Sequence, residues 1–152
     1  MFRGINSATL DSKGRMALPA RFREIVMAAS AGKVVVTIDI AERCLLLYPL
    51  GEWETLESKV EALSNVANRA RHLQRLLIGH ATDLELDANG RILLPQALRS
   101  YAGLDKKLTL VGQGRKVEIW NEERWGESVQ DWLDQDMSAL LADADEFNGL
   151  SL

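Results

Sequence analysis

The sequence predicts a mixed α/β fold with a mostly β core, built from two tandem copies of one unit and flanked by helices. The first observation is a repeat, since residues 10–23 align with residues 86–99 at seven identical positions. The second is that short apolar runs bounded by Gly, Pro and Asp are typical of strands joined by tight turns. A single copy of roughly 70 residues would bury only a marginal core. We therefore expect the two copies to interlock into one pseudo-twofold body.

Each copy begins with a predicted hairpin. We expect an extended segment at 7–10, an Asp-x-x-Gly-Arg turn, and a returning strand at 16–18. The second copy predicts the same elements at 83–86 and 92–94. Asp favours the first position of a type I turn, and Gly accepts the positive φ that closes a tight hairpin.

A helix and two strands follow each hairpin. Pro19 and Pro95 stand where the first turn of a helix tolerates proline, and Gly32 and Gly103 are plausible stops. The predicted strands are 34–39 and 44–48 in the first copy, and 107–111 and 116–120 in the second. The offset between the copies changes from 76 to 72 further on, which places a four-residue length difference near 28–32.

An amphipathic helix closes each copy, and its tryptophans predict core or helix-packing contacts. Its apolar positions are Trp53, Leu56, Val60 and Leu63 in the first copy, and Trp125, Val129, Trp132 and Leu133 in the second. The predicted organisation is a first unit at 1–66, a connecting helix at 67–80, a second unit at 81–133 and an acidic C-terminal tail at 134–152.

The net charge of −4 hides an uneven distribution of charge. Residues 1–33 carry six Lys and Arg against two acids, whereas residues 34–120 carry eleven of each sign. Residues 121–152 carry nine acids against one Arg. Because local potential steers a charged partner, the basic N-terminal surface keeps a polyanion open as a partner despite the net charge.

Several classes of protein are disfavoured. The single cysteine, Cys44, supplies neither an internal disulfide nor a Cys-rich zinc site, and its apolar surroundings predict a buried structural thiol. His72 and His80 are too far apart on a helix for joint metal ligation. Neither a signal peptide nor a membrane span is expected. No motif supports an enzyme, so we expect no catalytic, metal or cofactor site and no small-molecule substrate.

The two Asp-x-x-Gly-Arg turns hold the candidate functional residues. These are Asp11, Lys13, Gly14 and Arg15 in the first copy, and Asp87, Asn89 and Arg91 in the second. Glycine permits a close backbone approach, and arginine can reach a phosphate or the O6 and N7 atoms of guanine. The alternative is a purely structural turn, in which each Asp pairs with the Arg four residues on.

Several motifs, taken in order, resemble one known family. They are Met1-Phe2-Arg3-Gly4, Leu10–Arg15 with Leu18-Pro19, Cys44–Pro49, Trp53, Asp87–Pro95, Leu108–Gly112 and Ile119-Trp120. Together they are similar to the bacterial MraZ family over residues 1–133. The resemblance implies two AbrB-like swapped-hairpin units that form a pseudo-twofold double-split β-barrel. It also implies assembly into a ring-like homo-oligomer.

The same resemblance implies a function. It suggests a sequence-specific DNA-binding transcriptional regulator of the division and cell-wall gene cluster, which binds repeated boxes in double-stranded promoter DNA in the cytoplasm and nucleoid. Arg15 would read or clamp DNA, Lys13 would contact a phosphate, Gly14 would allow close approach and Asp11 would orient the arginine. The second copy departs from the first at Asn89, which weakens its expected DNA role.

An oligomeric scaffold or protein-binding module, with structural Asp–Arg pairs, is the alternative. Arg69, Arg71 and Arg75 on the predicted connecting helix fit a solvated face, a subunit contact or a phosphate contact. Salt dependence separates the two functions, because DNA affinity falls steeply with salt as counterions are released. A protein-binding module has no reason to bind a promoter fragment.

Overall fold

The computed structural model describes residues 1–64, 66 and 68–150. The chain divides into two compact units, Met1–Glu122 and Glu123–Leu152. The four-part division predicted from the sequence stays a prediction. Among the described residues, no helix combines the length and apolar character that crossing a membrane requires.

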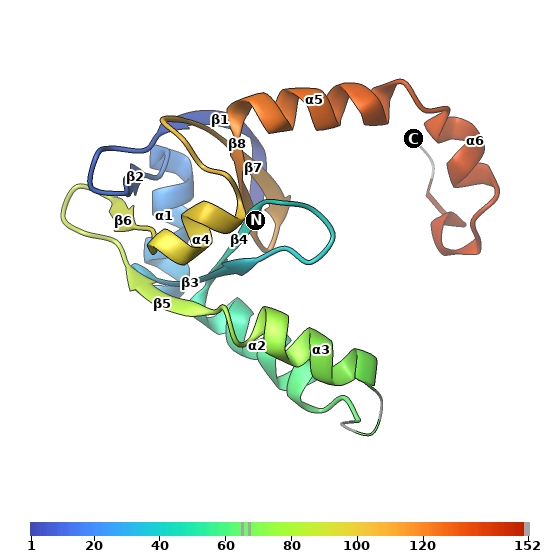
Figure 1. Cartoon of the computed structure of the whole chain (residues 1–152), viewed down its shortest axis with the longest axis horizontal. Coiled ribbons are helices and arrows are strands. Elements are labelled where there is room, and N and C mark those ends of the chain that lie inside the picture. Colours follow the sequence, from blue (N-terminus) through green and yellow to red (C-terminus); the bar gives the residue numbers. More distant parts are fainter. Residues whose placement is uncertain (65, 67, 151–152) are drawn as a thin grey trace. The chain divides into compact units, whose positions relative to one another are not determined.

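The first unit contains the turns, strands and helices that the repeat predicts (Figure 1). The predicted hairpin pairing is wrong, because the strands on either side of each turn pair with strands of the other copy, and one isolated bridge joins Leu10 and Met16. Its elements are β1 (Phe2–Thr9), β2 (Arg15–Ala17), α1 (Ala20–Ser30), β3 (Lys33–Ile38), β4 (Leu45–Pro49), α2 (Leu50–Glu61), α3 (Asn68–Leu77), β5 (Thr82–Glu85), β6 (Arg91–Leu93), α4 (Gln96–Tyr101), β7 (Lys107–Gly114) and β8 (Val117–Asn121). Strand β1 begins five residues earlier than predicted, because it pairs with β7 along its whole length. Helix α3 lies within the predicted connecting helix at 67–80 and ends three residues earlier, and Ala67 lies outside the described residues.

The strand order shows the pseudo-twofold relation of the copies. Six antiparallel strands form one sheet in the order β1-β7-β8-β4-β3-β5, and β2 and β6 form a separate two-stranded ribbon. Exchanging β1, β3 and β4 with their repeats β5, β7 and β8 reverses this order and otherwise leaves it unchanged. The six-stranded ladder is open, with β1 and β5 at its edges. The closed double-split barrel therefore stays a prediction.

Strands of one copy pair with strands of the other. Strand β1 pairs with β7, β3 with β5, and β2 with β6. Two backbone hydrogen bonds tie each hairpin to the opposite copy: Leu18 N–H donates to the Gly90 carbonyl at 3.0 Å, and Leu94 N–H donates to the Gly14 carbonyl at 2.9 Å. Neither copy therefore completes its hydrogen bonding alone.

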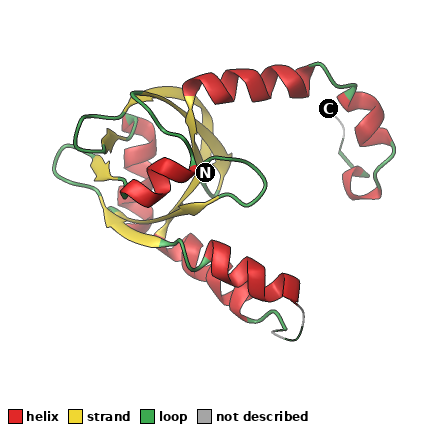
Figure 2. Cartoon of the chain, in the orientation of Figure 1, coloured by secondary structure: helices red, strands yellow, loops and turns green. Residues whose placement is uncertain are grey.

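The sheet buries side chains on both faces. On one face, alternate strand residues such as Val36, Leu47 and Ile119 pack with the β2–β6 ribbon, α1 and α4 in the main core. On the other face, Val35, Leu46 and Tyr48 pack against α2 and α3, which lie side by side as a helical pair (Figure 2). The ribbon and its turns are therefore held on the side of the sheet covered by α1 and α4.

The length difference between the copies lies where the change of offset predicts it. Helix α1 has 11 residues, whereas α4 has 6. Gly32 follows α1 with φ 90°, and Gly103 follows α4 with φ 58°, which confirms both predicted stops. The extra turn of α1 therefore adds length without changing the strands on either side.

The second unit contains α5 (Glu122–Leu133) from its second residue onward, α6 (Met137–Ala142) and a short 3-10 helix at Asp145–Phe147. The sequence pattern predicts α5 but not the two elements after it. Trp53 in α2 is buried, as predicted. By contrast, no residue of α5 is buried, and Trp125 and Trp132 pack edge to face at 5.8 Å between ring centroids. The closing helices of the two copies thus differ in their packing.

Candidate nucleic-acid interface

The first turn is organised by the carboxylate of Asp11. Its Oδ1 atom accepts hydrogen bonds from the backbone N–H groups of Lys13 at 2.9 Å and Arg15 at 2.8 Å. Its Oδ2 atom accepts from Arg15 Nε at 2.7 Å. The backbone closes the turn, since Gly14 N–H donates to the Asp11 carbonyl and Asp11 N–H donates to the Arg15 carbonyl. One carboxylate thus shapes the turn and holds the arginine.

The second turn repeats this arrangement bond for bond. Asp87 Oδ1 accepts from the backbone of Asn89 at 2.8 Å and of Arg91 at 2.9 Å, and Oδ2 accepts from Arg91 Nε at 2.9 Å. Gly90 N–H donates to the Asp87 carbonyl at 3.0 Å, the same distance as in the first turn. The pairing expected of a structural turn is therefore present in both copies.

These bonds hold both carboxylates in the ionised form. The hydrogen bond from the Arg15 backbone is the largest cause that lowers the pKa of Asp11 to about 2, partial burial opposes it, and the Arg15 side chain lowers it further. The pKa of Asp87 is lowered in the same way, first by the Arg91 backbone. Each aspartate is consequently a fixed negative anchor for its arginine at neutral pH.

Only one nitrogen of each guanidinium takes part in these bonds. Arg15 and Arg91 use Nε, and their two terminal nitrogens make no hydrogen bond to any other described residue. The side chains remain 32% and 31% exposed. A guanidinium held in this way is oriented, and it keeps donors for a phosphate or a base edge.

The ribbon places both arginines on one face. Met16 and Ile92 are buried and directly opposite each other in the β2–β6 pairing. Because side chains alternate along a strand, Arg15, Ala17, Arg91 and Leu93 lie on the other face. Leu93 is 54% exposed there. We call these four residues, together with Lys13 and Asn89 at the turns, the turn face.

The turn glycines approach arginines of the opposite copy. Gly14 has φ 85° and Gly90 has φ 71°, the left-handed conformation that the turn prediction requires. Both glycines are buried. A Cβ atom on Gly14 would lie 2.9 Å from Cζ of Arg99, and one on Gly90 would lie 2.1 Å from Nε of Arg23. The close approach seen here is to these arginines, and a close approach to DNA stays a prediction.

Sequence reasoning did not single out Arg23 and Arg99. They are one of the seven identical pairs of the repeat, which is the signal that marks them. Their positions beneath the opposite turns come from tertiary structure, which a local pattern does not report.

The three arginines predicted on the connecting helix lie on α3. Arg69, Arg71 and Arg75 are exposed, and none of them forms an ion pair with another described residue. All three predicted roles therefore stay open. The two histidines are also exposed.

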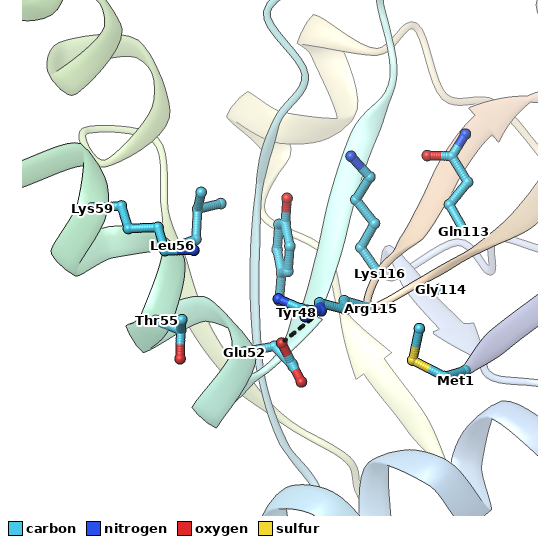
Figure 3. Close-up of a pocket in the computed structure, with 10 residues that line it drawn as sticks. All are labelled: Met1, Tyr48, Glu52, Thr55, Leu56, Lys59, Gln113, Gly114, Arg115 and Lys116. Atoms are coloured by element: carbon cyan, nitrogen blue, oxygen red, sulfur yellow. Dashed lines mark ion pairs between the residues drawn. The ribbon is translucent and has the colours of Figure 1, made fainter. Parts of the chain in front are cut away.

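A separate pocket of about 360 Å³ lies between α2 and the β7–β8 turn (Figure 3). Its lining includes the cationic side chains of Lys59, Arg115 and Lys116, and Glu52 pairs with Arg115 at 3.9 Å. None of the turn-face residues lines it. It is therefore distinct from the candidate interface.

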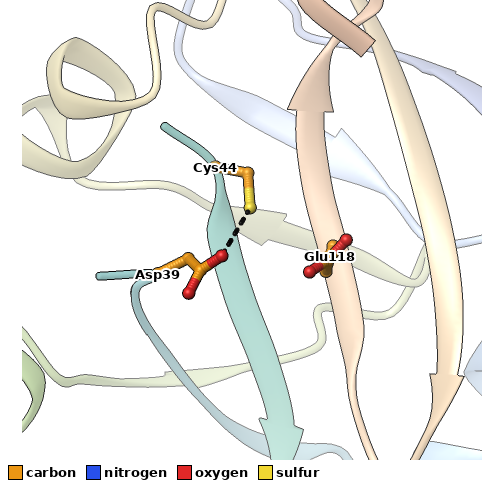
Figure 4. A group of neighbouring side chains, drawn as sticks. All are labelled: Asp39, Cys44 and Glu118. Atoms are coloured by element: carbon orange, nitrogen blue, oxygen red, sulfur yellow. Dashed lines mark hydrogen bonds between the residues drawn. The ribbon is translucent and has the colours of Figure 1, made fainter. Parts of the chain in front are cut away.

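A buried polar cluster lies where β3 ends and where β4 and β8 begin. The atoms of Asp39, Cys44 and Glu118 that could bind a ligand lie within 4.8 Å of one another, and the Cys44 thiol donates to Asp39 Oδ2 (Figure 4). Cys44 is fully buried, as predicted, and burial raises the pKa of its thiol. Burial also raises the pKa of Glu118, while a hydrogen bond from Trp120 Nε1 opposes the rise. The sequence pattern does not indicate that the two carboxylates are partners of the thiol.

Comparison with known proteins agrees with the repeat. The family model described as "MraZ protein, putative antitoxin-like" matches residues 1–76 and again residues 77–148. The transcriptional regulator MraZ of Marinomonas sp. (strain MWYL1) is 57% identical over 136 residues, which cover 90% of each chain. That of Alkalilimnicola ehrlichii is 54% identical over 135 residues, 89% of this chain and 90% of the relative.

A further relative is similar along its whole length. The transcriptional regulator MraZ of Legionella pneumophila (strain Corby) is 47% identical over 152 residues, which cover both chains completely. The double match to the family model and this identity confirm the resemblance seen in the sequence. The chain belongs to the MraZ family.

Proposed function

We propose that this protein is a transcription regulator that binds double-stranded DNA through the turn face. The observation that carries the proposal is the pair of arginines, each anchored by an aspartate through Nε with its terminal nitrogens left for a ligand. The name of the relatives, transcriptional regulator, supports the same function. It also favours a regulator over an enzyme.

The two arginines act from one surface. Arg15 is the base-reading or clamping residue, and Lys13 at the tip of the same turn contacts a phosphate. Arg91 supports this binding from the second turn, where Asn89 takes the place of the lysine. A two-stranded ribbon is narrow enough to enter a major groove, where bidentate arginine contacts to guanine carry sequence information.

The exchange of pairing partners between the copies supports a swapped-hairpin fold of the AbrB type. The double-split β-barrel is the finer form of this proposed fold. A single turn face offers few phosphate contacts, and few contacts give weak binding at physiological salt. Assembly into a ring-like homo-oligomer on repeated boxes raises the effective concentration of each later contact. The proposed target is the repeated boxes of the promoter of the division and cell-wall gene cluster, in the nucleoid.

The test is a binding titration of the purified protein against its own upstream region and a scrambled fragment of equal length. We expect tighter binding to the upstream region, and an affinity that falls steeply as salt rises. Reducing the number of boxes to one should remove most of the affinity. Equal affinity for both fragments at physiological salt would contradict sequence-specific binding.

The scaffold alternative rests on the Asp–Arg pairs themselves, because both are formed as a structural turn requires. The two functions differ in what the terminal nitrogens do. If the pairs are only structural, Arg15→Ala leaves DNA affinity unchanged. Light scattering at micromolar protein tests the assembly, and a strictly monomeric mass with tight DNA binding would contradict the oligomer.

A further inference from the structure

Arg23 in α1 and Arg99 in α4 each lie against the turn of the opposite copy. The Arg99 guanidinium fills the space next to Gly14, where an added Cβ would lie 2.9 Å from Cζ. The Arg23 guanidinium does the same next to Gly90. Both arginines are only partly exposed. The contact therefore occurs twice, each time between an arginine of one copy and the turn glycine of the other.

A short chain of hydrogen bonds completes each contact. Arg99 Nε donates to the Leu94 carbonyl at 3.0 Å, and Leu94 N–H donates to the Gly14 carbonyl at 2.9 Å. In the other copy, Arg23 Nη2 donates to the Leu18 carbonyl at 3.4 Å, and Leu18 N–H donates to the Gly90 carbonyl at 3.0 Å. One residue thus links each arginine to the turn it touches.

Core stability does not explain why these two positions hold arginine. Neither arginine forms an ion pair with another described residue. The Nε atom of Arg23 is buried and has no hydrogen-bond partner among the described residues. Placing a guanidinium inside a protein without full pairing costs stability, and an apolar side chain of similar length would fill the space without that cost.

We propose that Arg99 positions the first turn and Arg23 positions the second, so that each copy sets the conformation of the other copy's DNA-contacting turn. This inference rests on the proposed function, because it assigns positioning residues to the same interface. The guanidinium fixes the glycine and its carbonyl, and the glycine fixes the Asp–Arg pair on either side of it. Neither arginine needs to touch DNA.

The first experiment measures amide hydrogen exchange in the full-length protein without DNA. Arg99→Met should accelerate exchange of the Lys13 and Arg15 amides, which donate to Asp11, by at least about tenfold. It should leave the Asn89 and Arg91 amides unchanged. Arg23→Met should show the opposite pattern.

The first experiment supports the proposal only if each arginine variant accelerates exchange in the turn of the opposite copy. Arg21→Met is the matched control, because Arg21 is exposed on the same helix as Arg23, and it should alter neither turn. Faster exchange in the turn of the mutated copy, in both turns or in neither would overturn the proposal. If a methionine variant does not fold, the lysine variant at that position is measured against the same criteria.

The second experiment measures DNA binding as a function of salt. Arg99→Met should weaken binding to the upstream region about tenfold, the cost of one misplaced specific contact. The slope of log affinity against log salt should not change, and Arg99→Lys should not restore affinity, because the planar guanidinium and its Nε donor are lost.

A different result identifies Arg99 as a direct phosphate contact and overturns the positioning role. In that case the salt slope falls by about one and Arg99→Lys restores affinity. Unchanged affinity in Arg99→Met also overturns it, while leaving the proposed function intact. If the wild-type protein fails to distinguish the two DNA fragments, the proposed function fails, and the exchange pattern still decides whether the arginines position the turns.

Discussion

The two turns of the repeat have the same geometry but differ in the charged residues at and beside them. Corresponding hydrogen bonds in the first and second turns differ by at most 0.2 Å. The first turn carries Lys13 at its tip, whereas the second carries Asn89 and follows the exposed acids Asp83 and Glu85. The turns therefore hold their arginines alike and offer different potentials to a polyanion.

This comparison separates two kinds of residue within one motif. Aspartate and glycine determine the turn, because they supply the hydrogen-bond acceptor and the positive φ. The remaining tip residue and the flanking charges determine how strongly the turn attracts a phosphate. A duplicated unit can thus keep its fold in both copies while only one copy keeps the stronger binding surface.

The largest expected effect comes from separating the two copies. A fragment of residues 1–66 lacks β7, β6 and β5, which pair with β1, β2 and β3 respectively. We expect it to be unfolded or to dimerise, so that a second fragment supplies the missing strands. Circular dichroism melts with light scattering test this. A cooperatively melting monomer would contradict the interlocked structure.

Alanine at the turn glycines should distinguish the two turns by stability. Positive φ costs an alanine roughly 1–2 kcal/mol at either site. Gly90→Ala should be the more destabilising, since its Cβ would lie 2.1 Å from Arg23, compared with 2.9 Å from Arg99 for Gly14→Ala. Urea unfolding of both variants measures the difference. A larger loss for Gly14→Ala would contradict the tighter packing of the second turn.

The pH dependence of stability should show both turns acting in the same direction. The aspartate pKa values are lowered by folding, so their contribution is present above about pH 4 and is lost as pH falls. For Asp11 the loss extends to about pH 2. Asp11→Asn and Asp87→Asn should each flatten this acid limb, and Asp11→Asn should flatten it more. Chemical unfolding between pH 2 and 5 measures the free energy of unfolding of each protein.

Glu118 provides a control outside the turns with the opposite sign. Because burial raises its pKa, stability should fall as pH rises above the ordinary glutamate value of 4.5. Glu118→Gln should therefore raise the free energy of unfolding at pH 7 and leave it unchanged at pH 4. A loss of stability at pH 7 in Glu118→Gln would contradict this expectation, because it would show that the ionised carboxylate stabilises the folded state.

The turns could be predicted from the sequence because their geometry is local. Asp, Gly and Arg recur at a fixed spacing in both copies, and the hydrogen bonds of each turn join residues no more than four positions apart. The ends of the helices and most strand positions can also be predicted, because they too depend on local sequence. The start of β1 cannot, because it depends on pairing with β7, more than a hundred residues away.

The contacts between copies could not be read from local patterns. The identity of Arg23 and Arg99 marks them as a repeated pair, but alternation and spacing do not show that each lies beneath the opposite glycine. Glu118 alternates with inward-facing Val117 and Ile119, which is typical of an exposed strand position. It is only 8% exposed, because burial of the second face of a strand depends on tertiary packing.

The smallest effect is expected from exchanging the tip residues. Lys13→Asn should weaken DNA binding nearly equally for all sequences and reduce the salt slope by about one. Asn89→Lys should increase affinity by a smaller factor, because Asp83 and Glu85 remain beside the second turn. Binding titrations at several salt concentrations measure both slopes. A change in sequence preference in Lys13→Asn would contradict a phosphate role for Lys13.

The most direct test of the difference between the turns compares Arg15→Ala with Arg91→Ala on promoter and scrambled DNA, with thermal melts of both proteins. The two ion pairs are equivalent and partly exposed, so each variant should lose only about 1 kcal/mol of stability or less. Arg15→Ala should remove the preference for promoter DNA, at a cost of about 1–3 kcal/mol in specific binding. Arg91→Ala should weaken binding less and keep that preference. A greater loss of DNA affinity in Arg91→Ala than in Arg15→Ala would contradict the assignment of base reading to the first turn. Unfolding of Arg15→Ala would show that Arg15 is structural.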